Sequence, residues 1–268
     1  MNRRPIGVFD SGIGGLTVVR ELIRQLPHES LIYFGDTARV PYGNKSPETV
    51  RRYSREILEF LVSRDVKLVV VACNTASAHA LEELRRLAPV KVEGVIEPGA
   101  RAAVAASRGG RIGVIGTAGT VASGAYTRAI EQAADGRVQV AAQACPLFVP
   151  LVEEGWLDHA ATRLIAEEYL APLRAHDIDT LVLGCTHYPL LKPLLSSLLG
   201  PSITLIDSAE QTAAAVSREL ARSTLHAPAT ATGHVHFVVS DAPKQFVSVG
   251  KRFLGERVKD VETVPLGL

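Results

Sequence analysis

Short apolar runs rich in β-branched residues alternate with amphipathic helical stretches along most of the chain, and this alternation limits the possible folds more than any other feature. It predicts β-α-β units and therefore a parallel sheet. Runs that are apolar at nearly every position predict strands covered on both faces. The stretch 47–64 predicts a helix because its apolar residues recur near helical spacing. The predicted strands are 6–9, 31–35, 67–72, 91–96, 111–116, 138–143, 180–184, 203–207 and 234–240.

The chain also contains a weak internal repeat. Three pairs of similar segments occur in the same order, and the members of each pair lie about 110 residues apart. Repetition of this kind predicts two pseudo-symmetric α/β halves, each with a mainly parallel sheet flanked by helices. The pairs are IGVFDSGIGG (6–15) with IGVIGTAGTV (112–121), VVVACNT (69–75) with LVLGCTH (181–187), and VIEPG (95–99) with LIDSA (205–209).

The repeat predicts two domains with a cleft between them. We expect residues 1–98 to form the first α/β domain and residues 99–208 to form the second. The remaining tail, 209–268, contains one further predicted helix and the last predicted strand. Because that strand needs a sheet to pair with, we expect the tail to return to the first domain.

Composition excludes several classes of function. The 268-residue chain has a hydrophobic content of 47% and a formal net charge of +1, so no broad basic field indicates a nucleic-acid partner. The longest apolar runs are of strand length, and the N-terminal MNRRPIGVFD lacks the apolar core of a signal peptide. Three scattered cysteines argue against a disulfide scaffold. We therefore expect a cytoplasmic protein with no membrane partner.

Two of the cysteines occupy matching positions in the repeat. Cys73 follows the predicted strand 67–72, and Cys185 follows the predicted strand 180–184. Ligands of open parallel sheets bind beyond these carboxyl ends, and a thiol where a helix begins is expected to have a lowered pKa. If the halves face each other, the two thiols would flank one cleft from opposite sides. Cys145 has no counterpart in the repeat and is interpreted as a packing residue.

Polar side chains gather at the same strand ends. Short hydroxyls, amides and free N–H groups suit the carboxylates and the ammonium group of a small polar ligand. These candidate ligand-binding residues are Asp10, Ser11, Gly12, Gly35, Asp36, Thr37, Asn74, Thr75, Thr117, Thr120, Thr186 and His187.

Other interpretations of these residues stay open at this point. A buried cysteine is usually structural, and Cys73, Cys185 and His187 could ligate zinc, although no second CxxC-type pair supports a metal site. His187 could be an ordinary surface histidine, and Glu153 an ordinary solvated helix residue. The glycines of DSGIGG (10–15) lack the third glycine of a dinucleotide-binding turn and are not followed by a phosphate-binding GK[ST].

The lysines give no sign of a pyridoxal phosphate site. None of them lies in a setting that marks a Schiff base. Lys67 and Lys91 begin predicted strands, and both are expected to be solvated.

Taken together, five segments resemble the glutamate racemases, a branch of the cofactor-independent aspartate/glutamate racemase superfamily. The matching segments occur in family order and extend from residue 6 to about residue 208, nearly the whole chain, whereas the tail carries no motif. The segments are DSGIGGLTV (10–18), GDTARVPYG (35–43), ACNTASA (72–78), CPLFVPLVE (145–153) and GCTHYPLL (184–191).

The resemblance implies a fold, a site and an activity. It implies two α/β domains with one active site between them, Cys73 and Cys185 as the two catalytic cysteines, and no cofactor or metal. It implies racemisation of glutamate, which would supply D-glutamate for bacterial peptidoglycan, with a homodimer as one candidate assembly. Asp10 near the first cysteine, and Glu153 and His187 near the second, would assist. The implied substrate-binding residues are Asp10, Ser11, Tyr42, Gly43, Asn74, Thr75, Thr186 and His187.

Racemisation at a carbon atom needs a base on one face and an acid on the other, and two thiols in opposed halves provide both. The resemblance implies that Cys73 takes the proton of the D-enantiomer and Cys185 that of the L-enantiomer. Three competing functions are a racemase for aspartate or another small amino acid, a non-catalytic amino-acid-binding module, and a thiol-redox or zinc protein.

Overall fold

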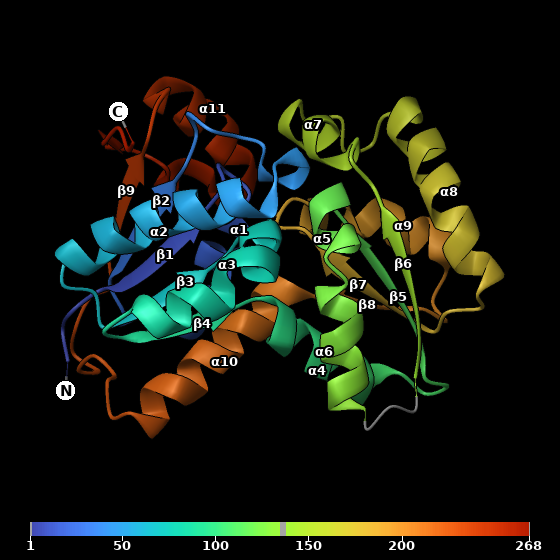
Figure 1. The fold of residues 1–268 in the computed structure, drawn as a ribbon. Helices are drawn as coiled ribbons and strands as arrows, with labels where there is room; N and C mark the ends of the chain where they lie inside the picture. Colours follow the sequence, from blue (N-terminus) through green and yellow to red (C-terminus); the bar gives the residue numbers. More distant parts are fainter. Residues whose placement is uncertain (1, 135–137, 268) are drawn as a thin grey trace.

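The computed structural model describes residues 2–134 and 138–267, and these residues form two parallel sheets. The six-stranded sheet has the order β10-β9-β2-β1-β3-β4, and the four-stranded sheet has the order β6-β5-β7-β8. Figure 1 shows the two sheets in separate lobes, each flanked by helices. We call the lobe with the six-stranded sheet the first half and the other lobe the second half. The strands are β1 (Ile6–Asp10), β2 (Leu31–Gly35), β3 (Leu68–Val71), β4 (Lys91–Gly94), β5 (Arg111–Gly116), β6 (Gln139–Ala144), β7 (Thr180–Gly184), β8 (Thr204–Asp207), β9 (Val235–Val239) and β10 (Glu262–Thr263).

The predicted α/β fold class is confirmed. Each of the nine predicted strands corresponds to a strand of the structure, and every strand pairing in the described residues is parallel. Strand β10 was not predicted, because a strand of two residues leaves no periodic pattern to recognise.

The tail strand β9 lies in the first half, where it pairs in parallel with β2 from Leu31↔Val235 to Gly35↔Val239. The exact domain boundaries stay predictions. Helix α4 (Ile96–Ala106) extends across the proposed boundary after residue 98 and packs against helices of the second half and of the tail.

Helices cover both sheets (Figure 1). Helix α2 (Pro47–Ser63) shows why they begin where they do. The Ser46 hydroxyl accepts a hydrogen bond from the N–H of Thr49 at 3.2 Å, and a proline occupies the first helical position. The prediction of a helix over 47–64 is confirmed, with its end at Ser63. The other α-helices are α1 (Leu16–Gln25), α3 (Asn74–Leu87), α5 (Ala118–Ala122), α6 (Ala125–Ala133), α7 (Phe148–Glu153), α8 (Ala160–Ala175), α9 (Lys192–Leu199), α10 (Ser208–Arg222) and α11 (Pro243–Leu254).

The central strands are covered on both faces, as their composition predicts. In β1, Ile6 and Val8 pack into one apolar cluster and Phe9 into another, on the opposite face of the sheet. All three side chains are fully buried, and burial of each stabilises the fold by roughly 1.5–3 kcal/mol. This packing holds the strand ends, and the polar residues that follow them, in fixed positions.

The expectation that Lys67 is solvated is wrong. Its side chain is buried, and its ammonium group forms an ion pair with Glu29 and donates to the carbonyl oxygens of Asn2 at 3.0 Å and Leu225 at 2.8 Å. The N-terminal segment and the segment after α10 cover this position, and nothing near Lys67 in the sequence indicates that cover. Lys91 is exposed, as expected.

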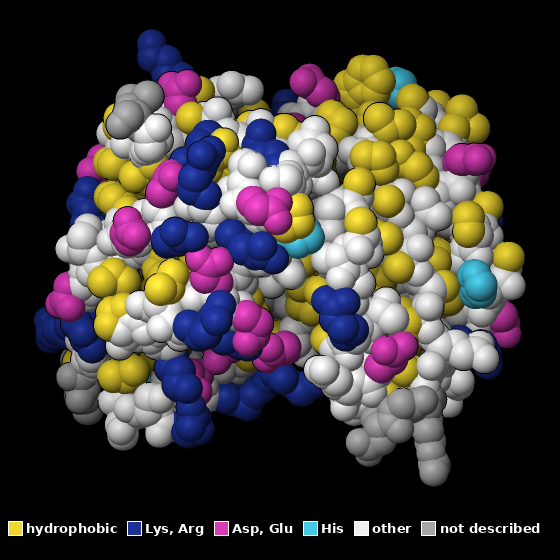
Figure 2. All heavy atoms as spheres, in the orientation of Figure 1, with side chains coloured by type: hydrophobic (Ala, Val, Ile, Leu, Met, Phe, Trp, Pro, Cys, Tyr) yellow, Lys and Arg dark blue, Asp and Glu magenta, His cyan; other side chains and the backbone are white. Residues whose placement is uncertain are grey.

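Charged side chains of both signs are mixed over the face of the first half seen in Figure 2. Hydrophobic side chains gather instead at the upper end of the second half, over α7 and α8, where Leu147, Trp156 and Leu164 are exposed. None of the helices in the described ranges is long and apolar enough to cross a bilayer.

Candidate active site

The two thiols of the repeat lie at the carboxyl ends of matching central strands. Cys73 directly precedes α3 and caps it, because its sulfur accepts a hydrogen bond from the N–H of Ala76 at 3.4 Å. Cys185 directly follows β7. Only 5% of each residue is exposed, and a charge on Cys185 is close enough to raise the pKa of Cys73. The thiols therefore belong to one buried site.

Cys73 has a carboxyl group and a hydroxyl group beside it. Its thiol donates to the hydroxyl of Ser11 at 3.6 Å. Burial and the neighbouring charge of Asp10 raise the pKa of Cys73 to about 12. The expectation of a lowered pKa is therefore wrong for this thiol, because the loss of water around the sulfur outweighs the helix N-terminus.

Asp10 is itself fully buried at the end of β1. One carboxylate oxygen, Oδ2, accepts a hydrogen bond from the N–H of Gly12 at 2.9 Å, whereas Oδ1 has no partner among the described residues. Burial raises the pKa of Asp10, which makes its carboxylate a stronger base than an exposed one.

Cys185 has a histidine and a second carboxylate on its side. The Nδ1 atom of His187 lies 3.9 Å from the sulfur, and Nε2 lies 2.8 Å from Oε1 of Glu153. Burial opposes the charged imidazole, but the hydrogen bonds to Cys185 and Glu153 outweigh it and raise the pKa of His187 to about 10. A protonated imidazole therefore lies beside the sulfur of Cys185.

The glycine-rich loop after β1 packs directly on the strand end that carries Cys185. A Cβ atom at Gly14 would lie 2.2 Å from Oγ1 of Thr186 and 2.4 Å from Nδ1 of His187. The hydroxyl of Thr17 donates to the carbonyl oxygen of Thr186 at 3.0 Å. The glycine therefore permits a close approach between the two halves, and no nucleotide is needed to explain it.

Three predicted threonines meet across the cleft. The hydroxyl of Thr75, in the first half, lies 2.9 Å from that of Thr117 and 3.2 Å from that of Thr120, both in the second half. Gly43 packs on this cluster, since a Cβ atom there would lie 2.7 Å from Cβ of Thr117. The structure thus brings four of the predicted ligand-binding residues together.

The side chain of Tyr42 is directed into a buried network. Its hydroxyl donates to the carboxylate of Asp36, which also accepts hydrogen bonds from Arg39 Nε and Ser240 Oγ, both at 2.8 Å. The role of Tyr42 in substrate binding stays a prediction, and its hydroxyl is already occupied. Asp36 was predicted as a polar residue at a strand end, like Asp10, and the structure shows its carboxylate occupied by this network.

Helix α11 of the tail contacts Glu153 and His187, the two side chains on the Cys185 side of the site. Arg252 donates to the carbonyl oxygen of Glu153, and the ring of Phe253 contacts the imidazole of His187 edge-on, with centroids 5.5 Å apart. Local sequence pattern gave no sign of this contact, because α11 lies about 65 residues beyond His187 and no repeat or motif links them.

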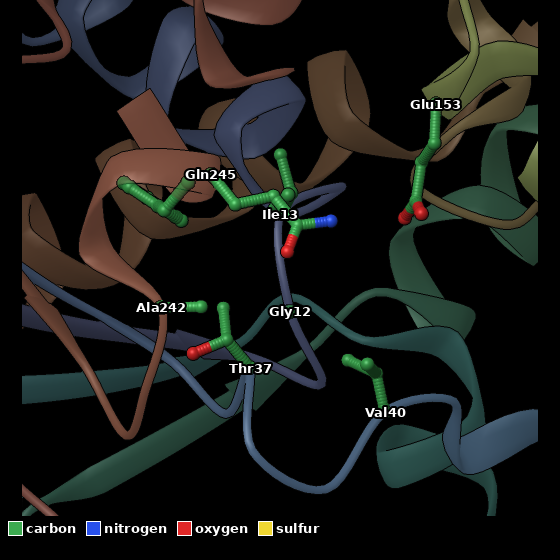
Figure 3. Close-up of a pocket in the computed structure, with 8 residues that line it drawn as sticks. Gly12, Ile13, Thr37, Val40, Glu153, Ala242 and Gln245 are labelled. Atoms are coloured by element: carbon green, nitrogen blue, oxygen red, sulfur yellow. The ribbon is translucent and has the colours of Figure 1, made fainter. Parts of the chain in front are cut away.

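A small cavity of about 60 Å³ lies beside Glu153. Figure 3 shows Glu153 reaching from the second half toward Gln245, Val40 and Thr37 of the first half. Neither cysteine lines this cavity. This cavity is therefore separate from the two sulfur atoms.

No group of three or more His, Cys, Asp or Glu side chains within residues 2–134 and 138–267 is arranged to hold a metal ion. Cys73, Cys185 and His187 are therefore not arranged as a zinc site of the usual kind. The expectation of activity without metal or cofactor stays a prediction.

These features define a class, an α/β protein in which two parallel sheets each present one thiol to a shared buried site. A sequence model of the Asp/Glu/Hydantoin racemase family matches residues 6–216, and the chain belongs to this family. It is 57% identical to the glutamate racemase of Geobacter metallireducens, over 98% of this chain and 97% of that one.

Two solved structures share the whole fold. The glutamate racemase isoform RacE1 from Bacillus anthracis has a TM-score of 0.94 and 42% identity, over 98% of both chains. The glutamate racemase from Francisella tularensis, solved in complex with D-glutamate, has a TM-score of 0.91 and 37% identity, also over 98% of both chains.

Proposed function

We propose that this protein interconverts L- and D-glutamate by moving the Cα proton between Cys73 and Cys185. The observation that carries the proposal is the pair of buried thiols from opposite sheets, each with its own acid–base partners. The glutamate racemases that match over nearly the full chain, one of them with D-glutamate bound, support glutamate as the substrate.

In the resting enzyme, the protonation states of the side chains suit proton removal from L-glutamate. Because the pKa of His187 is raised to about 10, the imidazole is protonated at neutral pH and places a positive charge beside Cys185. Cys73, with its pKa raised to about 12, is protonated. Cys185 therefore removes the proton from one face of Cα, and the Cys73 thiol delivers a proton to the opposite face.

The reverse reaction needs Cys73 as the base. We assign Asp10 to accept the thiol proton, because its charge already acts on Cys73 and its Oδ1 has no other partner among the described residues. On the other side, the imidazolium of His187 passes its proton to Cys185, which then donates it to Cα, and Glu153 holds His187 in place while this occurs.

The carbanion formed between the two steps has no cofactor to delocalise it. Hydroxyl and amide groups and free N–H groups at the strand ends would stabilise the substrate carboxylates, out of contact with water. The groups available are those of Ser11, Asn74, Thr75, Gly43 and the threonine cluster. Closure of the halves excludes water, in agreement with the buried thiols.

The biological role follows from the family resemblance. We propose that the product D-glutamate supplies bacterial peptidoglycan synthesis and that the reaction takes place in the cytoplasm, with a homodimer as the candidate assembly. The substrate is the one partner this role requires.

The proposal is tested by circular dichroism of L- and D-glutamate solutions incubated with metal-free protein and no added cofactor. Both signals should decay to zero. The Cys73→Ser and Cys185→Ser variants should lose this activity, because a serine hydroxyl is a far weaker base, whereas Cys145→Ser should retain it. Faster racemisation of aspartate than of glutamate, or loss of activity on EDTA treatment, would contradict the proposal.

A further inference from the structure

We infer that Tyr126 is a positioning residue whose hydroxyl fixes the amide of Asn74 so that its NH2 group faces the substrate. The inference rests on the proposed racemase function. Tyr126 lies in α6 of the second half, and Asn74 directly follows Cys73 in the first half. The tyrosine hydroxyl donates to Oδ1 of Asn74 at 2.7 Å, across the cleft.

The tyrosine ring is held rigidly. Tyr126 is 3% exposed, and its ring lies against the end of β7, where a Cβ atom at Gly184 would come within 2.9 Å of ring atom Cε2. A Cβ atom at Gly99 would lie 3.5 Å from the hydroxyl oxygen. Because the ring is buried and packs against the end of β7, the hydroxyl lies close to the strand that leads to Cys185.

This contact determines which way the Asn74 amide points. A side-chain amide has one acceptor oxygen and one NH2 donor group, and a hydroxyl that donates to the oxygen leaves the NH2 group on the other side. Nδ2 of Asn74 is buried and has no hydrogen-bond partner among the described residues. A buried donor without a partner costs about 1–3 kcal/mol, so this NH2 group is expected to have a partner in the working enzyme.

The missing partner is an acceptor, and its chemistry follows from its surroundings. Asn74 is the first residue of α3, where the helix N-terminus favours negative charge, and it adjoins Cys73. A carboxylate oxygen of glutamate satisfies both conditions. The free amide donor is therefore directed at a substrate carboxylate, and Tyr126 keeps the amide oxygen, which would repel it, turned away.

The test is the dissociation constant of D-glutamate, measured by calorimetry, for Tyr126→Phe in a Cys73→Ser background, which does not racemise the ligand during the titration. This change keeps the ring and removes only the hydroxyl. We expect affinity for both enantiomers to fall about tenfold, because the amide can then turn its oxygen toward the carboxylate. The matched control is Tyr169→Phe, which removes a hydroxyl that accepts from Leu147 N–H at 3.4 Å and should leave affinity unchanged.

A double-mutant cycle separates positioning from a general structural effect. In an Asn74→Ala background no amide remains to be oriented, so Tyr126→Phe should cause no further loss of affinity. An equal loss in both backgrounds, or wild-type affinity in the single Tyr126→Phe variant, would overturn the inference. Should Tyr126→Phe fail to fold, Asn74→Asp replaces the NH2 group by a carboxylate oxygen while keeping an acceptor for Tyr126. Wild-type affinity in Asn74→Asp would equally overturn it.

Failure of this inference is distinct from failure of the proposed function. A wild-type protein that neither binds nor racemises glutamate would refute both. A wild-type protein that racemises glutamate, together with an unaffected Tyr126→Phe variant, would refute only the role of Tyr126.

Discussion

At the scale of single residues, the two thiols differ in the charge beside them. Cys73 has a carboxyl group, that of Asp10, as its neighbour, and Cys185 has the imidazole of His187. A negative neighbour disfavours thiolate and a positive neighbour favours it. Cys73 is therefore a thiol at neutral pH, whereas a protonated imidazole lies beside Cys185.

The first prediction concerns the pH dependence of kcat/KM. Its profile should be bell-shaped, because one thiol must be ionised and the other protonated. As pH rises through about 10, His187 loses its proton, and the positive charge beside Cys185 disappears. We therefore expect the rate to fall on the alkaline side near pH 10.

The His187→Gln variant tests the origin of the alkaline decline. Glutamine carries no charge at any pH, so the variant should be slower at neutral pH and should lack the decline that His187 causes. Initial rates across the pH range would show this. An alkaline decline at the same pH in the variant and the wild type would mean that another group is responsible.

At the same scale, sequence reasoning located the site better than it described its chemistry. Both cysteines could be placed at strand ends because parallel strands and a repeat leave a readable pattern. The raised pKa of Cys73 could not be predicted, since it depends on burial that only the folded chain creates. Glu153 was predicted through the family resemblance alone, because only the fold brings it to His187.

At the scale of elements, the loop from β1 to α1 sets the distance between the halves. Replacing Gly14 by alanine would place a methyl group within 2.2 Å of Thr186 Oγ1 and 2.4 Å of His187 Nδ1. The loop and the strand end must then separate, which displaces His187 from Cys185. We expect kcat/KM to fall about a hundredfold, the size of effect that a displacement of about 1 Å can produce.

A matched control for this prediction is Gly99→Ala in α4. A Cβ atom there meets its nearest neighbours at 3.5 Å, an ordinary contact, and alanine is favoured over glycine within a helix by roughly 0.5–1 kcal/mol. Its activity and melting temperature should match or exceed those of the wild type. If Gly14→Ala were as active as Gly99→Ala, the close approach would have no functional importance.

Most elements could be predicted from the sequence because their patterns are local. The nine strands of four or more residues, β1 to β9, and helix α2 could be predicted from apolar periodicity. The contacts of α11 with Glu153 and His187 could not be predicted, since they join segments far apart in sequence.

At the scale of the whole molecule, the buried pair of Lys67 and Glu29 ties three parts of the chain together. Besides Glu29, the ammonium group contacts the N-terminal segment at Asn2 and the tail at Leu225, and Glu29 accepts from the N–H of Ala227 at 2.8 Å. The tail carries β9, which completes part of the first sheet. The pair therefore anchors the tail to the half that contains Cys73.

Removing one member of this pair should destabilise the fold strongly. Lys67→Met leaves the Glu29 carboxylate buried without its partner, and we expect the free energy of unfolding to fall by about 3–5 kcal/mol. The double variant with Glu29→Gln removes the second charge and keeps an acceptor for Ala227, so most of the loss should be recovered. Urea unfolding measures both. A double variant less stable than Lys67→Met would contradict this explanation. It would show that the unpaired Glu29 carboxylate is not the cause of the lost stability.

The central claim is that each thiol serves one face of the substrate. Racemisation rates alone do not test it, because the enantiomers have equal free energies in solution and kcat/KM must be equal in both directions for any variant. An irreversible half-reaction removes this constraint. A glutamate analogue with a leaving group on Cβ or nitrogen eliminates after one proton is removed, without reprotonation.

The decisive measurement is therefore the rate of elimination from the L- and D-forms of such an analogue by the two serine variants. Cys73→Ser should retain elimination from the L-form, through Cys185, and lose it for the D-form. Cys185→Ser should show the opposite preference. The same enantiomer preference in both variants would contradict the two-thiol account and require a mechanism with a single base.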